Sequence, residues 1–194
     1  MNTRKVTGSV IAAIALLTIG GAAQADIGGA LKMCVNCHGT DGRGTESDVP
    51  IIAGIPAFVQ EDALYAYLDG DRDCGSKPLM CKSVSRLSED QIVELAEHFA
   101  ALPYVPANED FDESLAGVGK TLHMKNCAIC HGRDEPGDAQ ASILHGQRKD
   151  YIRYALQQYA AGKRKQLPAM EKKTTALSAD DIEALLNYYA SYQN

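Results

Sequence analysis

The sequence has little positive charge: 19 Lys and Arg residues stand against 25 Asp and Glu residues, which gives a formal net charge of −6. Nucleic-acid-binding proteins concentrate positive charge on one surface, so this balance argues against nucleic-acid binding. The sequence also lacks tryptophan and has no alternating β-branched runs of strand length. The second absence argues against half-buried β-strands and favours an all-α protein.

Long hydrophobic runs are missing after residue 25. Before it, Arg4 and Lys5 precede a short apolar run, and residues 1–25 end in Ala23-Gln24-Ala25, the pattern of a cleaved secretion signal. A membrane anchor is the alternative, but the apolar run is shorter than the roughly 20 residues that a membrane span needs. We therefore expect cleavage after Ala25, export to the periplasm, and a mature chain with no stable membrane insertion.

What the sequence does contain is an internal repeat. Cys34-Val35-Asn36-Cys37-His38 recurs 93 positions later as Cys127-Ala128-Ile129-Cys130-His131, and further glycine, leucine, tyrosine and methionine positions recur at offsets of 90 to 92. The repeat predicts two tandem domains, over residues 26–102 and 114–194. The segment 103–113 between them contains two prolines and an acidic run, which cannot continue a helix, so we expect an exposed linker.

Two helices are expected in the later part of each copy. A terminal helix is indicated by a capping box, Ser88 with Gln91 in the first copy and Ser178 with Asp181 in the second, followed by apolar residues at helical spacing. A middle helix is expected near Ala57–Leu68 and near Lys149–Ala160, each followed by a glycine. Domains of this size bury little surface, so we expect a cofactor to complete each core.

The pentapeptide Cys-x-x-Cys-His is typical of covalent haem attachment, because cysteines three apart reach the two vinyl groups while the adjacent histidine faces the iron. A zinc site needs four protein ligands around one ion. A thioredoxin-like redox pair belongs to a β-α-β unit, which this sequence does not provide. A plain disulfide is the third alternative. The repeat therefore predicts two covalently bound haem c groups, on Cys34, Cys37 and His38 and on Cys127, Cys130 and His131.

An electron-carrying haem needs a sixth iron ligand, and methionine is a common one. Met80 lies 42 residues after His38, and Met170 lies 39 residues after His131, each in a proline-bearing segment that we expect to be a loop. We predict that these two methionines bind iron opposite the histidines. We expect core or surface roles for the unmatched residues Met33, Met124, His98, His123 and His145.

The ring of each iron-binding histidine should donate its other N–H to a backbone carbonyl. Pro50, twelve residues after His38, is well placed to supply or frame that carbonyl, whereas Ser142 occupies the corresponding place in the second copy and leaves its acceptor unassigned. Cys74 and Cys81 remain after haem attachment. In an oxidising compartment, such a close pair predicts a disulfide across the segment that holds Met80, with free thiols as the alternative.

The two halves differ in charge. Asp26–Glu113 carries 6 basic and 17 acidic residues, a net charge of −11, and Ser114–Asn194 carries 11 and 8, a net charge of +3. We expect the loops near the two methionines to differ in sign and to favour different partners, although charged loops are often merely solvated. The residues concerned are Asp69, Asp71 and Asp73 before Met80, and Lys163, Arg164, Lys165, Lys172 and Lys173 around Met170.

With these motifs, the mature chain resembles tandem class I cytochromes c, and most closely the dihaem subunit of flavocytochrome c sulfide dehydrogenase. Two stretches carry the narrower resemblance: Phe111-Asp112-Glu113-Ser114-Leu115-Ala116, continuing through Gly119-Lys120-Thr121-Leu122-His123, and Pro168-Ala169-Met170-Glu171-Lys172-Lys173. It implies an electron-transfer subunit without a catalytic site of its own. Its partners would be an FAD-containing subunit that oxidises sulfide and a small periplasmic electron acceptor.

Two other functions remain open. A free-standing dihaem shuttle would feed a terminal oxidase without a stable flavoprotein partner. An enzyme that oxidises a sulfur anion at one haem would need an open or displaceable axial position on that iron.

Overall fold

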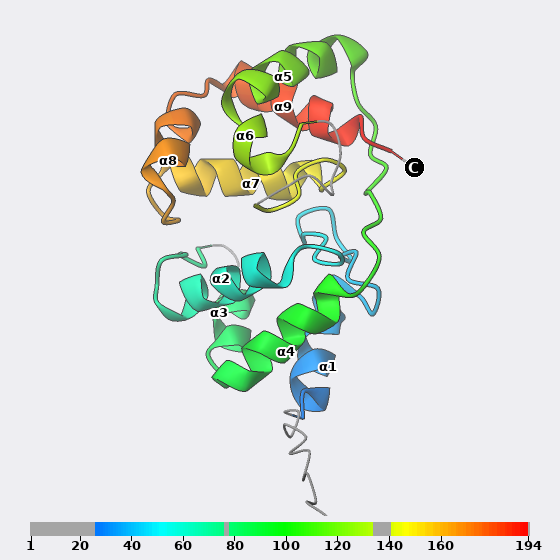
Figure 1. Ribbon diagram of the computed structural model, residues 1–194, viewed down its shortest axis with the longest axis vertical. Helices are drawn as coiled ribbons and strands as arrows, with labels where there is room; N and C mark the ends of the chain where they lie inside the picture. The colour runs from blue at the N-terminus through cyan, green and yellow to red at the C-terminus, as the bar shows by residue number, and fades with distance from the viewer. Residues whose placement is uncertain (1–25, 76–77, 134–140, 194) are drawn as a thin grey trace, which may run out of the picture.

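The computed structural model describes residues 26–75, 78–133 and 141–193, and over these residues the chain is helical without strands (Figure 1). A single isolated antiparallel bridge joins Arg72 and Arg164 within the described residues. The expectation of an all-α fold is confirmed. The predicted secretion signal, residues 1–25, lies outside the described residues.

The helices form two bodies that are stacked along the long axis of the molecule (Figure 1). The lower body in the figure holds the helices up to Ala100, and the upper body holds the helices from Glu113 onward; an extended segment along one side joins them. The helices are α1 (Gly28–His38), α2 (Ala57–Leu68), α3 (Pro78–Val84), α4 (Glu89–Ala100), α5 (Glu113–Asn126), α6 (Ala128–His131), α7 (Lys149–Ala160), α8 (Pro168–Thr174) and α9 (Ala179–Ala190).

The expected middle and terminal helices are present. Helices α2 and α7 have the predicted bounds, and Gly70 and Gly162 follow them with φ of +77° and +67°, the left-handed region that glycine adopts readily. Helices α4 and α9 begin with both predicted capping boxes, in which the serine side chain accepts from the backbone N–H three residues on.

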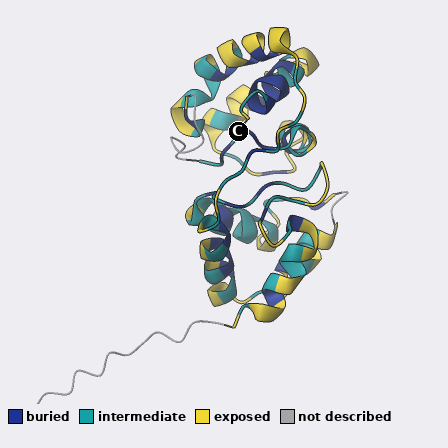
Figure 2. Ribbon diagram, turned by 90° about the vertical axis from the view of Figure 1, so that its right-hand side faces the viewer, coloured by how far each residue is buried: buried dark blue, intermediate teal, exposed yellow. Residues whose placement is uncertain are grey.

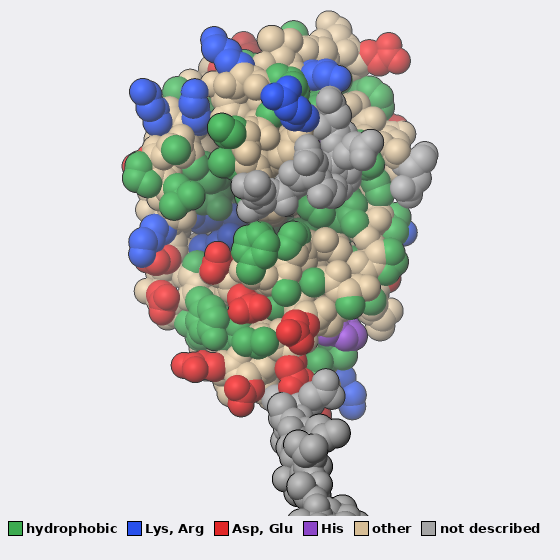
Figure 3. Space-filling model, viewed as in Figure 1, with side chains coloured by type: hydrophobic (Ala, Val, Ile, Leu, Met, Phe, Trp, Pro, Cys, Tyr) green, Lys and Arg blue, Asp and Glu red, His purple; other side chains and the backbone are tan. Residues whose placement is uncertain are grey.

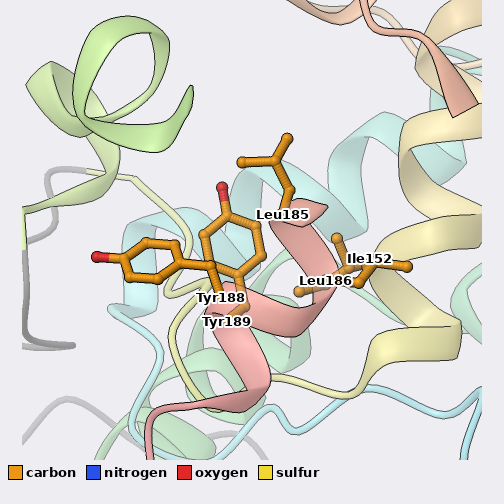
Figure 4. Close-up of a cluster of buried hydrophobic side chains, with 5 residues drawn as sticks. All are labelled: Ile152, Leu185, Leu186, Tyr188 and Tyr189. Atoms are coloured by element: carbon orange, nitrogen blue, oxygen red, sulfur yellow. The ribbon is translucent and has the colours of Figure 1, made fainter. Parts of the chain in front are cut away.

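Each body has its own apolar core, and exposed residues cover the outer faces of the helices (Figure 2). In the first body, Leu95 and Phe99 of α4 pack with Ala30 of α1. In the second body, Ile152 of α7 packs against a buried face of α9 (Figure 4). That face comprises Leu185, Leu186, Tyr188 and Tyr189.

Helices α5 and α9 approach each other very closely at Gly119. A Cβ atom added to Gly119 would lie 2.0 Å from the carbonyl oxygen of Ala184 and 2.8 Å from Cβ of Tyr188. Gly117, two residues earlier on α5, has nothing within 4 Å of the same position. The close helix crossing therefore requires glycine at position 119, because any side chain there would clash with α9.

The segment between the two bodies is exposed only in part. Pro106 is buried, and the Tyr104 hydroxyl donates to the carbonyl of His145 at 2.7 Å. A Cβ on Gly54 would collide with Tyr104, and a Cβ on Gly146 would collide with Pro106. The ends of the segment are exposed as predicted, whereas its middle is covered, because the prolines that prevent a helix also leave the chain extended enough to lie against both bodies.

Polar contacts also join the two bodies directly. The buried Gln147 side chain accepts from the backbone N–H of Ile51 and donates to the carbonyl of the same residue, each at 2.8 Å. Arg148 donates to the carbonyls of Arg43 and Gly44. These bonds pair backbone groups of Arg43, Gly44 and Ile51, which lie in the loop between α1 and α2 and outside any helix.

The charged loops meet at this junction as well. Lys165 Nζ lies 2.7 Å from an Asp71 carboxylate oxygen, and Lys163 Nζ lies 3.9 Å from one of Asp73. We expected the loops near the two methionines to differ in sign and to favour different partners. The signs differ as expected, and for these four residues the opposite charges pair with one another across the two bodies.

Candidate functional site

The first Cys-x-x-Cys-His motif occupies the end of a continuous helix. Cys34 and Cys37 lie in the last two turns of α1, which ends at His38. In the second body, α5 ends at Asn126, and α6 carries the chain from Ala128 to His131. All four motif cysteines are free thiols, and the second of each pair, Cys37 or Cys130, is exposed.

A glycine follows the histidine in both motifs, a feature that our sequence analysis missed although the repeat displays it. Gly39 has φ 76° and ψ 160°, and Gly132 has φ 78° and ψ 160°. This backbone conformation is unfavourable for residues with a Cβ. The matched glycines therefore turn the chain away from both histidines in the same manner.

Backbone carbonyls orient both histidine rings. His38 Nδ1 lies 3.2 Å from the carbonyl oxygen of Pro50, and His131 Nδ1 lies 3.0 Å from that of Ser142. A carbonyl only accepts, so Nδ1 carries the proton in each ring and Nε2 is left as the unprotonated donor atom for a metal. The expected role of Pro50 is confirmed, and the acceptor in the second copy is the carbonyl of Ser142.

The pKa shifts of the motif histidines and thiols favour metal binding by the histidines and disfavour a redox-active thiol pair. Burial lowers the pKa of His38 and His131 more than their carbonyl contacts raise it, so both rings are neutral at pH 7. Burial also raises the pKa of the Cys34 and Cys127 thiols, which disfavours the thiolate that a redox-active pair would use.

This donor set fits haem c. Each motif offers two unbridged thiols three residues apart and one neutral imidazole with a fixed orientation. Exposed apolar side chains lie in the second motif and close in sequence to the candidate methionines: Ile129 is 90% exposed, Leu79 next to Met80 is 68% exposed, and Leu167 near Met170 is 74% exposed. Within the described residues, no three His, Cys, Asp or Glu side chains gather as a metal cluster.

The two candidate methionine ligands occupy equivalent places. Met80 is the third residue of α3, Met170 is the third residue of α8, and both side chains are half-buried. We expected loops here. The structure instead has short helices that begin at Pro78 and Pro168, because the fixed φ of proline suits the first turn of a helix.

The disulfide between Cys74 and Cys81 is present, with the two Cα atoms 5.9 Å apart. Cys74 is buried, and Cys81 directly follows Met80 on α3. The bridge therefore ties the start of α3 to the preceding loop in the first body, and the second body has no cysteines at the equivalent places.

The unmatched histidines of the second body have core roles, as expected. His123 is fully buried; its Nδ1 lies 3.1 Å from the Tyr189 hydroxyl, and its Nε2 lies 2.6 Å from the carbonyl oxygen of Gly132. His145 is 2% exposed and contacts the Tyr188 hydroxyl through Nε2 at 3.2 Å. Since both ring nitrogens of His123 have protein partners, this histidine supports the turn after His131.

Comparison with known sequences finds cytochromes c among the relatives of this chain. The family model described as cytochrome c oxidase, cbb3-type, subunit III matches residues 115–188. Cytochrome c-554(548) from Halomonas halodenitrificans is 37% identical over 68 residues, which cover 35% of this chain and 82% of that protein.

Solved structures match both bodies together. A cytochrome c4 from Acidithiobacillus ferrooxidans, 26% identical, superimposes with a TM-score of 0.71 over 82% of this chain and 99% of that one. The thiosulfate dehydrogenase TsdBA from Marichromatium purpuratum, 27% identical, superimposes with a TM-score of 0.65 over 81% of this chain and 36% of that one. Among the described residues, no helix has the length and apolar character of a membrane span.

Proposed function

Because the chain belongs to the class I cytochromes c and carries two covalent haem c groups, we propose that it is a periplasmic electron carrier that receives electrons from a sulfur-oxidising dehydrogenase. The observation that carries the proposal is the matched geometry of the two motifs. Each offers two free thiols and a histidine whose Nδ1–H is held by a backbone carbonyl.

When bound, haem supplies a one-electron couple between ferrous and ferric iron. The residues that would hold the two groups are Cys34, Cys37, His38 and Met80 in the first body and Cys127, Cys130, His131 and Met170 in the second. A methionine sulfur favours ferrous iron, so His/Met ligation gives a higher reduction potential than two histidines would. The chain itself contributes ligation, orientation and exclusion of water.

The first candidate donor is an FAD-containing subunit that oxidises sulfide. Two observations support a sulfur-oxidising partner: the stretches that resemble the cytochrome subunit of flavocytochrome c sulfide dehydrogenase, and the structural similarity to thiosulfate dehydrogenase TsdBA. The signal-like pattern of residues 1–25 supports a periplasmic location. A small periplasmic electron acceptor would then receive the electrons.

A free-standing shuttle to a terminal oxidase is the second candidate. Its support is the match to the family model of a cbb3-type oxidase subunit, together with similarity to nearly the whole length of a cytochrome c4. In either role the charges on the protein surface affect how partners approach. Basic side chains gather on the α5–α9 body and acidic ones on the α1–α4 body in the face drawn in Figure 3, and such a field steers charged partners.

The test is purification from the native host under conditions that preserve complexes, followed by visible spectra and mass analysis. Comigration with a flavin-containing chain supports the dehydrogenase subunit, whereas a dihaem monomer without flavin supports the shuttle. Spectra in which one iron lacks a sixth protein ligand and responds to sulfide or thiosulfate would overturn both and indicate an enzyme that acts at haem.

A further inference from the structure

Two buried histidine–tyrosine pairs lie next to the second Cys-x-x-Cys-His motif. In the first pair, His123 Nδ1 lies 3.1 Å from the Tyr189 hydroxyl. In the second pair, His145 Nε2 lies 3.2 Å from the Tyr188 hydroxyl. The two tyrosines are neighbours on α9 (Figure 4), and the ring centres of the two histidines are 4.9 Å apart. All four side chains are at most 7% exposed, so they form one buried polar cluster.

Both pairs hold the backbone directly after His131, the candidate iron ligand. His123 Nε2 lies 2.6 Å from the carbonyl oxygen of Gly132. The Tyr188 hydroxyl donates to the carbonyl of Arg133 at 3.0 Å. Two consecutive carbonyls after the iron ligand are therefore held by side chains from α5 and α9.

The first body holds the residue after its motif through backbone hydrogen bonds. The carbonyl of Gly39, which follows His38, accepts from the N–H of Gly42 at 3.2 Å. The Gly42 carbonyl in turn accepts from the N–H groups of Ile52 and Ala53 at 2.8 and 3.1 Å. The two bodies therefore fix the equivalent stretch of chain by different means.

The internal repeat shows that the polar side chains of the first pair are specific to the second body. At the offset of 93 that relates the two motifs, His123 corresponds to Ala30. At the offset of 90 that relates Ser88 to Ser178, Tyr189 corresponds to Phe99. Ala30 and Phe99 pack together in the apolar core of the first body. Their side chains form no hydrogen bonds, so one place in the fold is apolar in the first body and polar in the second.

The hydrogen positions in the first pair follow from its acceptor. The Gly132 carbonyl only accepts, so His123 Nε2 carries the proton and Nδ1 accepts from the Tyr189 hydroxyl. The Cys127 thiol makes a hydrogen bond with the same hydroxyl, and it donates to the oxygen because the hydroxyl hydrogen points to His123. The negative end of the hydroxyl therefore faces Cys127 Sγ, the atom that would be attached to the second haem.

We propose that His123 and Tyr189 are positioning residues that lower the reduction potential of the second haem. The Tyr189 oxygen places partial negative charge beside the attachment point of the haem, and His123 keeps the hydroxyl in that direction. Negative charge stabilises ferric iron relative to ferrous iron, which carries one positive charge less. The effect is strong because the pair is buried away from water. Phe99 has no hydroxyl, so the pair makes the two haems unequal.

The test is a redox titration of the exported holoprotein, followed by visible spectra after mass analysis has verified both haems. Tyr189→Phe is the main variant, since it removes one hydroxyl and leaves the residue that the first body carries at Phe99. We expect the ratio of reduced to oxidised second haem at a given potential to rise about threefold, or about 28 mV, with no change for the first haem. Met170→Ala removes the candidate ligand of the second haem alone and so identifies its redox wave.

Tyr104→Phe is the matched control. It also removes a hydroxyl that donates a hydrogen bond in the second body, but that bond ends at the carbonyl of His145 and not at the motif. Both potentials should stay unchanged in this variant. The proposal fails if the second haem of Tyr189→Phe has the wild-type potential or a lower one, or if Tyr104→Phe shifts it equally.

His123→Ala tests whether the histidine directs the hydroxyl. Without Nδ1 as its acceptor, the Tyr189 hydroxyl can turn its hydrogen toward Cys127 Sγ, so the potential of the second haem should rise further than in Tyr189→Phe. The double variant His123→Ala/Tyr189→Phe should return to the value of Tyr189→Phe, because the hydroxyl is then absent. Two shifts that simply add would contradict the proposal. If the His123 variants do not fold, Tyr189→Phe and its control decide alone.

The proposal rests on the attached second haem and not on the identity of the electron donor. A chain whose mass shows only one haem would contradict both the proposed function and this inference. Unchanged potentials in a chain with two haems would contradict this inference alone.

Discussion

Single backbone atoms decide how the two candidate iron-binding histidines are held. The acceptors are the carbonyls of Pro50 and Ser142, which share no side-chain chemistry. This explains why the sequence identified one acceptor through its proline and left the other unassigned: a carbonyl is present at every residue, so its use leaves no compositional signal. The glycine after each histidine is the residue whose identity the turn requires.

Replacement of the candidate methionine ligands tests the ligation directly. Met80→Ala and Met170→Ala should each abolish the sulfur-to-iron charge-transfer band of one haem, leaving about half of the wild-type intensity, because each sulfur serves one iron. Visible spectra of the oxidised holoprotein measure this band. Met33→Ala and Met124→Ala are the controls, since they remove the same group from α1 and α5 and should leave the band unchanged. A full-intensity band in Met80→Ala or Met170→Ala would identify a different ligand for that haem.

Among the helices, the crossing of α5 and α9 is the most demanding contact. Gly119→Ala should destabilise the protein by about 3 kcal/mol or more, because the added Cβ would meet the Ala184 backbone and the helices would have to separate. Thermal or denaturant unfolding measures the loss. Gly117→Ala, on the same helix with open space around it, should be neutral or stabilising by up to about 1 kcal/mol. Equal losses in the two variants would contradict a packing cause.

The start of α9 should give the protein a pH-dependent stability. Bonds from the Ser178 backbone N–H and hydroxyl lower the pKa of Asp181 in the folded state. A lowered folded-state pKa contributes stability above the unfolded-state pKa, and this contribution is lost as the pH falls through the folded-state pKa. Asp181→Asn should therefore lower the melting temperature at pH 7, and the difference from wild type should shrink as the pH falls through the folded-state pKa of Asp181.

Asp180→Asn is the control for this prediction, because it removes a charge from the same first turn but leaves the Ser178 capping box in place. It should have a smaller effect at pH 7. A loss as large as that of Asp181→Asn would mean that the charge near the helix end matters and the capping box does not.

The sequence predicted the elements whose signals are local. The capping boxes at Ser88 and Ser178 and the glycines after α2 and α7 act within one or two turns, so α4, α9, α2 and α7 were placed correctly. The proline-bearing segments around Met80 and Met170 are expected as loops from the sequence but are short helices, since proline is favourable at the first position of a helix.

Across the whole molecule, the contacts between the two bodies were not predictable in the same way. Ile51 and Gln147 are 96 residues apart, and nothing local marks the glutamine as the partner of a distant loop. The sequence shows the charge imbalance between the halves, but it does not show which of the opposite charges pair across the junction. Counting charges does not indicate that Asp71 and Lys165 form an ion pair, because only the fold brings these two distant residues together.

Gln147→Ala tests how strongly the two bodies depend on each other. The variant leaves the buried N–H and carbonyl of Ile51 without partners, at a cost of about 1–3 kcal/mol for each group. We expect a lower denaturant midpoint in equilibrium unfolding of the holoprotein. Ser47→Ala, which removes an exposed bond to Asp150 between the same two bodies, should change stability by less than about 0.5 kcal/mol. A midpoint for Gln147→Ala that coincides with that of Ser47→Ala would mean that water replaces the glutamine.

The bridge between Arg72 and Arg164 has a consequence for the origin of the chain. A residue that pairs with its own duplicate lies where a two-fold axis would pass in a symmetric dimer of a single ancestral unit. In such a dimer of the first body, Asp71 would face a second Asp73, and in one of the second body Lys163 would face a second Lys165. Since the fused chain places aspartate against lysine instead, gene duplication followed by divergence would have made each half prefer the other over a copy of itself.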